Sequence, residues 1–236
     1  KNSNTLIHTD AVQSAAHLGV DVEQLGVDLL TATAHKLYGP RGAGVLYQRA
    51  GTPMVPQVLG GGQEAGRRAG TENTPAIVGF AQATALAQER READIHHERT
   101  LQQRLIDELP KRIPMLGVTG PRNVSERLPG NVSVVVAFVE GESILLALDL
   151  AGIAASSGSA CTTGSVEPSH VLVAMGIPPE LARGSLRFSL GRENTDKDID
   201  RLLEVLPGVV ERMRALSPLP AKEAPVEWQP WLENQT

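Results

Sequence analysis

Apolar and polar positions divide the chain into short segments of alternating type. Apolar runs bounded by Gly, Pro and polar residues predict strands, and they lie at 5–8, 27–36, 42–49, 115–121, 131–139 and 184–191. Apolar residues at helical spacing predict helices, and these lie at 9–26, 74–109, 141–152, 168–176 and 195–216. Strands that alternate with helices indicate an α/β layered architecture.

The same pattern suggests two domains and a tail. We expect one domain over residues 1–85 and a smaller α+β domain over 86–216, joined by the long helix. The charged stretch 88–109 predicts a solvated helical face, with His96 and His97 as surface residues. The Pro-rich residues 217–236 predict an extended tail, whose Trp228 and Trp231 would dock on this protein or on a partner.

Composition narrows the class of protein. The chain has 236 residues, of which 41% are hydrophobic, and its formal net charge is −5. An acidic chain argues against a nucleic-acid surface, and no apolar run approaches the roughly 18 residues of a membrane helix. We expect no metal site, and a cytoplasmic location. A targeting peptide stays open, because the sequence opens without Met.

The single cysteine, Cys161, lies in the polar segment "SSGSACTTG". One cysteine excludes an internal disulfide and favours a reducing compartment. Free cysteines are usually buried as small apolar residues, whereas this segment has the composition of an exposed loop. We expect a cysteine loop over residues 155–166 with an accessible thiol.

Lys36 follows an apolar strand and a run of small residues in "TATAHKLYGP". A lysine amine that loses its solvation becomes nucleophilic and forms a Schiff base with a carbonyl group. The alternative is an ordinary surface lysine whose stem packs along apolar residues.

Asp10 and Gln13 lie three residues apart in "HTDAVQ", on one side of a predicted helix start. A carboxylate at this position would cap the helix. It would also pair with the protonated ring nitrogen of pyridoxal phosphate. Both interpretations stay open at this point.

Two further segments carry basic residues. The loop "GGGQEAGRRAGTENT" offers glycine N–H groups, Arg67, Arg68 and the Thr71 hydroxyl to a phosphate, although a flexible basic loop is the more common outcome. Arg187, between Leu186 and Phe188, points opposite to its apolar neighbours in a strand. It would bind a carboxylate or form a structural ion pair.

Together these residues form a set that suits a pyridoxal-phosphate enzyme acting on an amino acid. The chain resembles the cysteine desulfurases of iron–sulfur cluster assembly, in the class V aminotransferase group of fold type I. The motifs that carry the resemblance cover residues 4–205 in the family's order: "HTDAVQS", "TATAHKLYGPRGAGVLY", "GGGQEAGRRAGTENT", "SSGSACTTGSVEPSHVL" and "LRFSLGR".

The resemblance implies roles for individual residues around the cofactor. Lys36 would hold pyridoxal phosphate covalently and act with His35 as a catalytic residue. Asp10 would pair with the ring nitrogen, and Gln13 with the ring oxygen. Thr33 and His35 would contact the phosphate, although Thr33-Ala34 stands where the family commonly has Ser-Gly.

The resemblance also implies the remaining roles and the partners. Arg187 would bind the carboxylate of L-cysteine, and Cys161 would accept its sulfur and pass it to an acceptor protein such as an iron–sulfur scaffold. Thr71 would reach the cofactor of the second subunit in a homodimer. Residues 1–85 would be the C-terminal part of the large cofactor-binding domain, since the family's first half does not precede them.

That difference in length leaves alternatives. The rest of the active site would come from a separate N-terminal chain or from the other piece of a nicked enzyme, or the sequence covers only part of the protein. We favour a nicked or split enzyme. Three competing functions stay open. The protein would be a selenocysteine lyase-like enzyme, an aminotransferase, or a non-catalytic half that only carries sulfur on Cys161.

Overall fold

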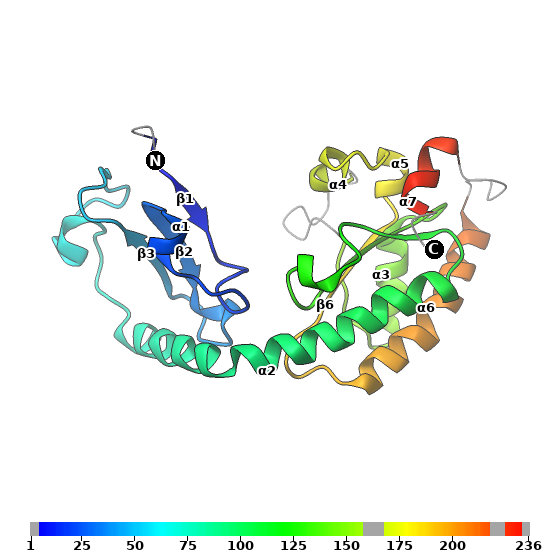
Figure 1. The fold of residues 1–236 in the computed structure, drawn as a ribbon, viewed down its shortest axis with the longest axis horizontal. Helices are drawn as coiled ribbons and strands as arrows, with labels where there is room; N and C mark the ends of the chain where they lie inside the picture. Colours follow the sequence, from blue (N-terminus) through cyan, green and yellow to red (C-terminus); the bar gives the residue numbers. More distant parts are fainter. Residues whose placement is uncertain (1–4, 158–167, 218–224, 233–236) are drawn as a thin grey trace. The chain divides into compact units, whose positions relative to one another are not determined.

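The computed structural model describes residues 5–157, 168–217 and 225–232 (Figure 1). The chain divides into two compact units, Lys1–Ala93 and Asp94–Thr236. The helix α2, which covers Thr74–Arg112, runs through the boundary. Each unit is described by itself below, and the domain limits expected from the sequence stay a prediction.

A three-stranded sheet forms the first unit. Its strands are β1 (His8–Asp10), β2 (Leu29–Thr33) and β3 (Gly44–Gln48), in that order. β1 and β2 are parallel, and β3 is antiparallel to β2. The carboxyl ends of β1 and β2 therefore lie at the same edge, together with the start of β3.

The helix predicted over residues 9–26 is wrong over most of its length. After β1 the chain makes successive turns, and helix α1 covers only Val22–Leu25. The side chain of Asp21 caps the amino end of α1, and Gly26, with φ of 62°, ends the helix in the left-handed region. Gly19 and Val20 interrupt the apolar spacing, and a segment this short does not nucleate a helix easily.

A loop with one 3-10 turn, η2 (Gln63–Gly66), leads into α2. Glu64 and Ala65 have φ of 53° and 55°, a region that non-glycine residues rarely occupy. The sequence predicts that α2 ends before Pro110, but the helix continues to Arg112. Proline removes one hydrogen bond there without ending the last turn.

The second unit is an antiparallel sheet covered by helices. Its strands are β4 (Leu116–Val118), β5 (Asn131–Val136) and β6 (Ser185–Ser189), with β5 in the centre. The helices are α3 (Gly141–Leu150), α4 (His170–Ala174), α5 (Pro179–Ala182) and α6 (Asp196–Leu216), and a 3-10 turn η3 covers Val124–Glu126. Figure 1 shows α3 beside α6.

The alternation along β5 places side chains in two apolar clusters. Val132, Val134 and Val136 pack in the larger cluster with residues of α2, α3 and α6. Val135 packs in the smaller cluster with residues of α4 and α5. Period-two alternation sends successive side chains to opposite faces of the sheet. The sheet is therefore buried on both faces at its central strand.

The described part of the tail is helical, whereas the sequence predicts an extended chain. Val226–Trp228 form a 3-10 turn, η4, and Gln229–Leu232 form the short helix α7. Trp228 is buried in the smaller cluster, and its ring lies 5.4 Å from that of Phe138. Burial of the large aromatic ring stabilises the docked turn.

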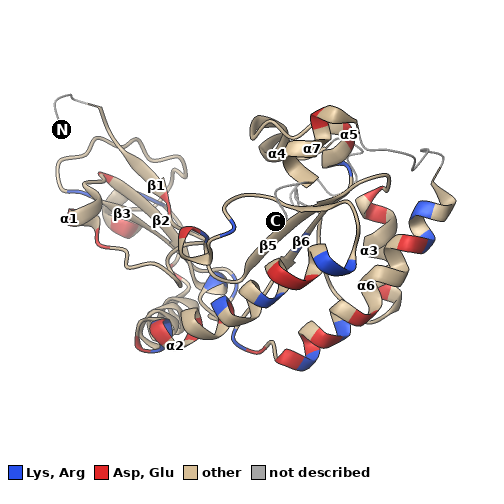
Figure 2. Cartoon of the chain, turned by 45° about the vertical axis from the view of Figure 1, so that its right-hand side comes forward, with Lys and Arg blue, Asp and Glu red and all other residues tan. Residues whose placement is uncertain are grey.

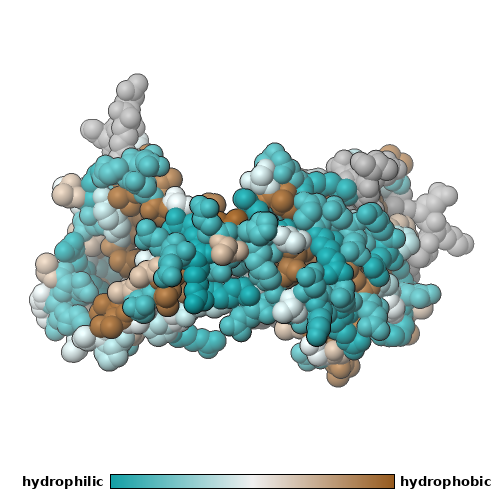
Figure 3. Space-filling view, turned by 60° about the horizontal axis from the view of Figure 1, so that its bottom comes forward, coloured by the Kyte–Doolittle hydropathy of each residue, from teal (hydrophilic) through white to brown (hydrophobic). Residues whose placement is uncertain are grey.

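Charged and apolar residues both lie on the surface. Figure 2 shows acidic and basic residues alternating along α6, and Figure 3 shows apolar residues among hydrophilic ones. Exposed apolar residues include Val55 and Leu59 of the first unit and Leu150 and Val226 of the second. Within the described ranges, every helix is too short or too polar to cross a membrane.

Candidate functional site

Lys36 lies in the 3-10 turn η1 (Ala34–Lys36), which follows β2 directly. Ala34 is fully buried under this turn, and its carbonyl accepts the N–H of Gly39 at 2.9 Å. A Cβ atom at Gly39 would lie 2.9 Å from that oxygen, so only glycine fits. The turn leaves Lys36 exposed in this structure, although its place after an apolar strand suggests burial.

Asp10 ends β1 opposite Thr31 of β2. Its Oδ1 accepts the backbone N–H of Val12 at 2.9 Å, which stabilises a turn, whereas the helix that this carboxylate was expected to cap does not form there. The carboxylate is exposed, and a carboxylate accepts more than one hydrogen bond. Gln13 is exposed three residues later.

Thr33 and His35 contact each other at the end of β2. Thr33 Oγ1 donates to the carbonyl oxygen of Ala43 at 3.0 Å and lies 3.0 Å from Nδ1 of His35. A hydroxyl has one proton, so His35 donates to Thr33 through Nδ1–H in this arrangement. A phosphate at Thr33 would therefore compete with Ala43 for the hydroxyl proton.

The glycine-rich loop lies in the same unit. Gln63 Oε1 accepts the N–H of Gly70 at 3.2 Å, and Arg67 Nε donates to the Glu64 carbonyl at 3.1 Å. Arg67 and Arg68 line an open pocket of about 920 Å³, together with residues of β2 and β3. Thr71, near the end of this loop, is exposed.

Arg187 occupies the middle of β6, in the second unit. Its neighbours Leu186 and Phe188 are buried, and Arg187 is half-buried, as expected for a side chain on the other face. Its Nε is buried without a hydrogen-bond partner in the described ranges. An orphaned guanidinium N–H favours an anionic ligand there.

Cys161 lies outside the described residues. The described chain ahead of Cys161 ends at residue 157. In it, Ser156 forms a β-bridge with Arg187 through two backbone hydrogen bonds. Nothing in the sequence singled out Ser156.

The structure brings part of the predicted set together. Asp10 and Thr33 end neighbouring parallel strands at one edge of the first sheet, and His35 and Lys36 follow at once. Ligands of open α/β sheets bind outside the carboxyl ends of the strands. This edge is therefore the candidate site of the first unit.

Comparison with known proteins decides the family. The model of the aminotransferase class-V family matches residues 1–202. This chain belongs to the aminotransferase class-V family. The sequence-based expectation of this group, and of its α/β fold type I architecture, is confirmed.

The relatives carry consistent names. Cysteine desulfurase IscS of Clostridium botulinum is 45% identical over 235 residues, which cover 100% of this chain and 57% of that protein. Cysteine desulfurase IscS 1 of Archaeoglobus fulgidus is 48% identical over 218 residues, which cover 92% and 56%. The chain therefore spans little more than half the length of these relatives.

Solved structures agree with these relatives. A NifS-like protein from Rickettsia africae superposes with a TM-score of 0.79 at 32% identity, covering 87% of this chain and 54% of its own. A second NifS-like protein gives a TM-score of 0.80 at 34% identity, with 90% and 54% covered. Class-V aminotransferases and cysteine desulfurases depend on pyridoxal phosphate.

The residues present fit that cofactor chemically. An amine that forms a Schiff base, a carboxylate for the ring nitrogen, and hydroxyl and imidazole groups for a phosphate lie at the strand ends. These groups therefore suit pyridoxal phosphate. One conflict remains in the present side-chain arrangement, because the Thr33 hydroxyl proton is already donated to the carbonyl oxygen of Ala43.

Proposed function

We propose that the protein is a cysteine desulfurase, which converts L-cysteine to L-alanine and carries the released sulfur on Cys161. The observation that supports this most is the identity of 45–48% to desulfurases across nearly the whole chain. The selenocysteine lyase alternative finds no support among these relatives.

The proposed cofactor-binding residues are Lys36, Asp10, Gln13, Thr33, His35 and Thr71. When bound, pyridoxal phosphate supplies an electron sink for charge that develops at the α-carbon of the amino acid. The Asp10 carboxylate favours the protonated ring nitrogen, because an opposite charge stabilises the charged form.

The remaining residues act on the substrate. Arg187 binds the carboxylate of L-cysteine through its guanidinium group and so orients the amino acid. The amine Nζ of Lys36 removes the α-proton as a general base. The Cys161 thiolate attacks the substrate sulfur, the carbon–sulfur bond breaks, and a sulfur–sulfur bond forms on the enzyme. The carbon that loses sulfur takes up a proton, and Lys36 returns a proton to the α-carbon, which gives alanine.

The partners follow from this chemistry. The persulfide sulfur would pass to a thiol of an acceptor protein, such as an iron–sulfur scaffold. We propose a homodimer in which Thr71 reaches the second subunit's cofactor, and a cytoplasmic location. An N-terminal polypeptide, covering what the relatives have beyond this chain, would supply the rest of the cofactor site.

The test follows the sulfur. The protein, purified together with the N-terminal polypeptide, is incubated with pyridoxal phosphate and L-cysteine. Alanine is measured, and peptide mass spectrometry examines Cys161. We expect alanine and the mass of one added sulfur atom on Cys161. The absorbance band of lysine-bound cofactor should be present, and Lys36→Ala should abolish it.

Cys161→Ser separates the alternatives. For a desulfurase, this variant keeps the cofactor band and loses sulfur release. An aminotransferase would keep its activity in Cys161→Ser, and a non-catalytic sulfur carrier would show no cofactor band at all. Either result would overturn the proposal.

A further inference from the structure

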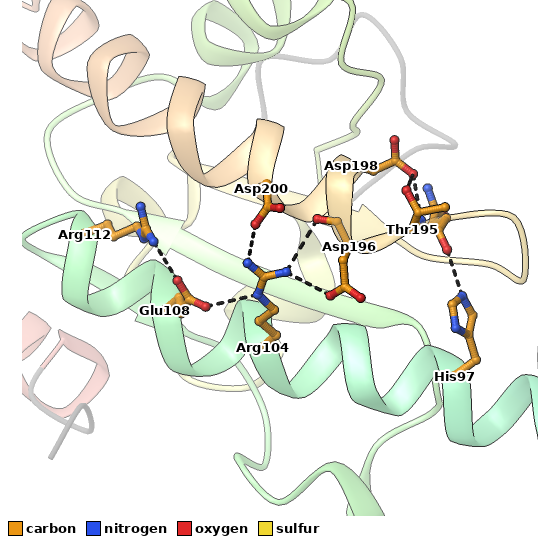
Figure 4. Close-up of polar contacts among 9 residues, drawn as sticks. His97, Arg104, Glu108, Arg112, Thr195, Asp196, Asp198 and Asp200 are labelled. Carbon is orange, nitrogen blue, oxygen red and sulfur yellow. Dashed lines mark hydrogen bonds and ion pairs between the residues drawn. The ribbon is translucent and has the colours of Figure 1, made fainter.

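Helix α2 holds the turn that follows β6 through several side chains. Asp94 Oδ2 lies 3.0 Å from Arg192 Nη2. His97 Nε2 lies 2.8 Å from the carbonyl oxygen of Asn194 (Figure 4). Asp94 and His97 are one helical turn apart, so both face the same segment. With Glu98 and Gln102 of the same helix, we call this set the α2 clamp.

Gln102 is fully buried in the clamp. Its Nε2 donates to the carbonyl oxygens of Leu128 at 3.0 Å and Asn131 at 2.7 Å. Both amide protons are thereby used, which fixes the orientation of the amide. Its Oε1 is buried and receives no hydrogen bond from the part of the chain that the structure describes. A buried acceptor of this kind needs a donor.

Glu98 lies one turn before Gln102 on the same face of α2 and is 1% exposed. A Cβ atom at Gly130 would lie 3.1 Å from Glu98 Oε2, so the carboxyl packs against the backbone there. The carbonyl oxygen of Gly130 accepts the N–H of Leu190 at 2.8 Å. Glu98 and Gln102 therefore support the segment that holds the end of β6.

The charged groups around Glu98 come from two elements. Asp94 faces it from α2, and Arg192 faces it from the turn after β6, while the loop before β5 presents the Gly130 backbone. Burial raises the pKa of Glu98 to about 7, Asp94 adds to the rise, and Arg192 opposes it. The neutral form is thus well populated at physiological pH.

We propose that Glu98 carries a proton and donates it to Oε1 of Gln102, which makes Glu98 a positioning residue for the strand of Arg187. The proton of Glu98 satisfies the buried amide oxygen of Gln102. The hydrogen bond holds the loop before β5 against α2, and this loop in turn holds the end of β6. The link to Arg187 as substrate-binding residue rests on the proposed function, whereas the proton and the hydrogen bond do not.

The pH dependence has a definite sign. The folded-state pKa of Glu98 lies above its ordinary value of 4.5, so the folded chain retains this proton where the unfolded chain has lost it. The clamp is therefore complete at low pH and is lost as the pH rises through about 7. Above that value a buried negative charge replaces the hydrogen bond.

The experiment measures the carboxyl group directly. The protein is labelled with ¹³C-glutamate and titrated by NMR, and the resonance missing in Glu98→Gln identifies Glu98. We expect its midpoint near pH 7, with the backbone amides of residues 187–194 shifting at the same midpoint. A midpoint near 4.5, or amides that do not move with it, would overturn the proposal.

Control variants distinguish the effect of the Glu98 proton from a general effect of charge on α2. Glu108 also lies on α2, but it pairs with Arg104 and Arg112 outside the clamp. Glu108→Gln should leave the Glu98 midpoint and the amides of β6 unchanged, whereas Glu98→Gln should make those amides independent of pH. If Glu98→Gln does not fold, Glu98→Asp identifies the resonance instead, and the titration of the unaltered protein decides.

A kinetic arm tests the positioning role where desulfurase activity is present. The KM for L-cysteine should rise several-fold between pH 6 and 8, with little change in kcat, and should stay flat in Glu98→Gln. Equal pH profiles in both proteins would contradict the positioning role. The absence of any activity would instead count against the proposed function, since the titration does not depend on turnover.

Discussion

Thr33 joins the end of β2 to the start of β3 through its hydroxyl, which donates to Ala43 at 3.0 Å. Thr33→Val keeps the shape of the side chain and removes this hydrogen bond. We expect the free energy of unfolding to fall by about 1 kcal/mol, as measured by urea denaturation. Thr33→Ser keeps the hydroxyl and should stay closer to the unaltered protein; equal stability of Thr33→Val would contradict this role.

Single residues differ in how far their sequence context reveals them. Lys36 and Arg187 stand out because apolar neighbours predict a strand before Lys36 and a strand around Arg187. The structure places Lys36 in the turn after β2 and Arg187 within β6. Glu98 lies in a highly charged stretch that predicts a solvated helical face. Its carboxyl packs against the backbone of Gly130, which is distant in sequence. Local pattern carries no information on such contacts.

Helices α2 and α6 are joined by the guanidinium group of Arg104. Figure 4 shows it contacting Glu108 of its own helix and Asp196 and Asp200 of α6. Arg104→Met keeps the apolar stem and removes the charge. Because ion pairs with partly exposed partners contribute little each, we expect a loss of about 1 kcal/mol, and a smaller loss at high salt because the charges are screened.

Denaturation at two salt concentrations measures the contribution of Arg104. The control is Arg201→Met, whose pair with Glu204 lies within α6 and is exposed, so its effect should be smaller at both concentrations. If the loss of unfolding free energy in Arg104→Met does not depend on salt, the link is not ionic.

The pKa of Glu108 is lowered by Arg112 and Arg104. The stabilisation by these ion pairs is therefore present at neutral pH and is lost as the pH falls through the folded-state pKa of Glu108.

Elements with strong local signals were predictable. Helix α6 was expected over 195–216 and covers Asp196–Leu216, because Thr195 and Asp198 form a capping box and the buried residues follow the helical period. The segment after β1 has similar spacing without a stable nucleus, so its prediction as a helix was wrong. The tail turn at Val226–Trp228 depends on packing against Phe138, which no local pattern contains.

Each hydrophobic cluster is built from residues of one unit. The clusters of the first unit are small and rich in alanine, with Ala11, Ala34 and Ala83 among their buried members. The largest cluster belongs to the second unit and consists mainly of Leu, Ile and Val. Because stabilisation grows with the apolar area buried, the second unit should be the more stable of the two.

The whole chain should therefore unfold in two steps. We expect two calorimetric transitions, with the first unit unfolding at the lower temperature.

Variants assign the two transitions to the two units. Trp228 is 7% exposed in the smaller cluster of the second unit. Trp228→Ala should therefore lower the temperature of the upper transition only, with a loss of unfolding free energy of about 3 kcal/mol. Val226→Ala, at a residue 83% exposed in the same tail, should leave both unchanged. Thr33→Val should lower only the first transition. A single transition that shifts in both Trp228→Ala and Thr33→Val would show that the two units unfold as one.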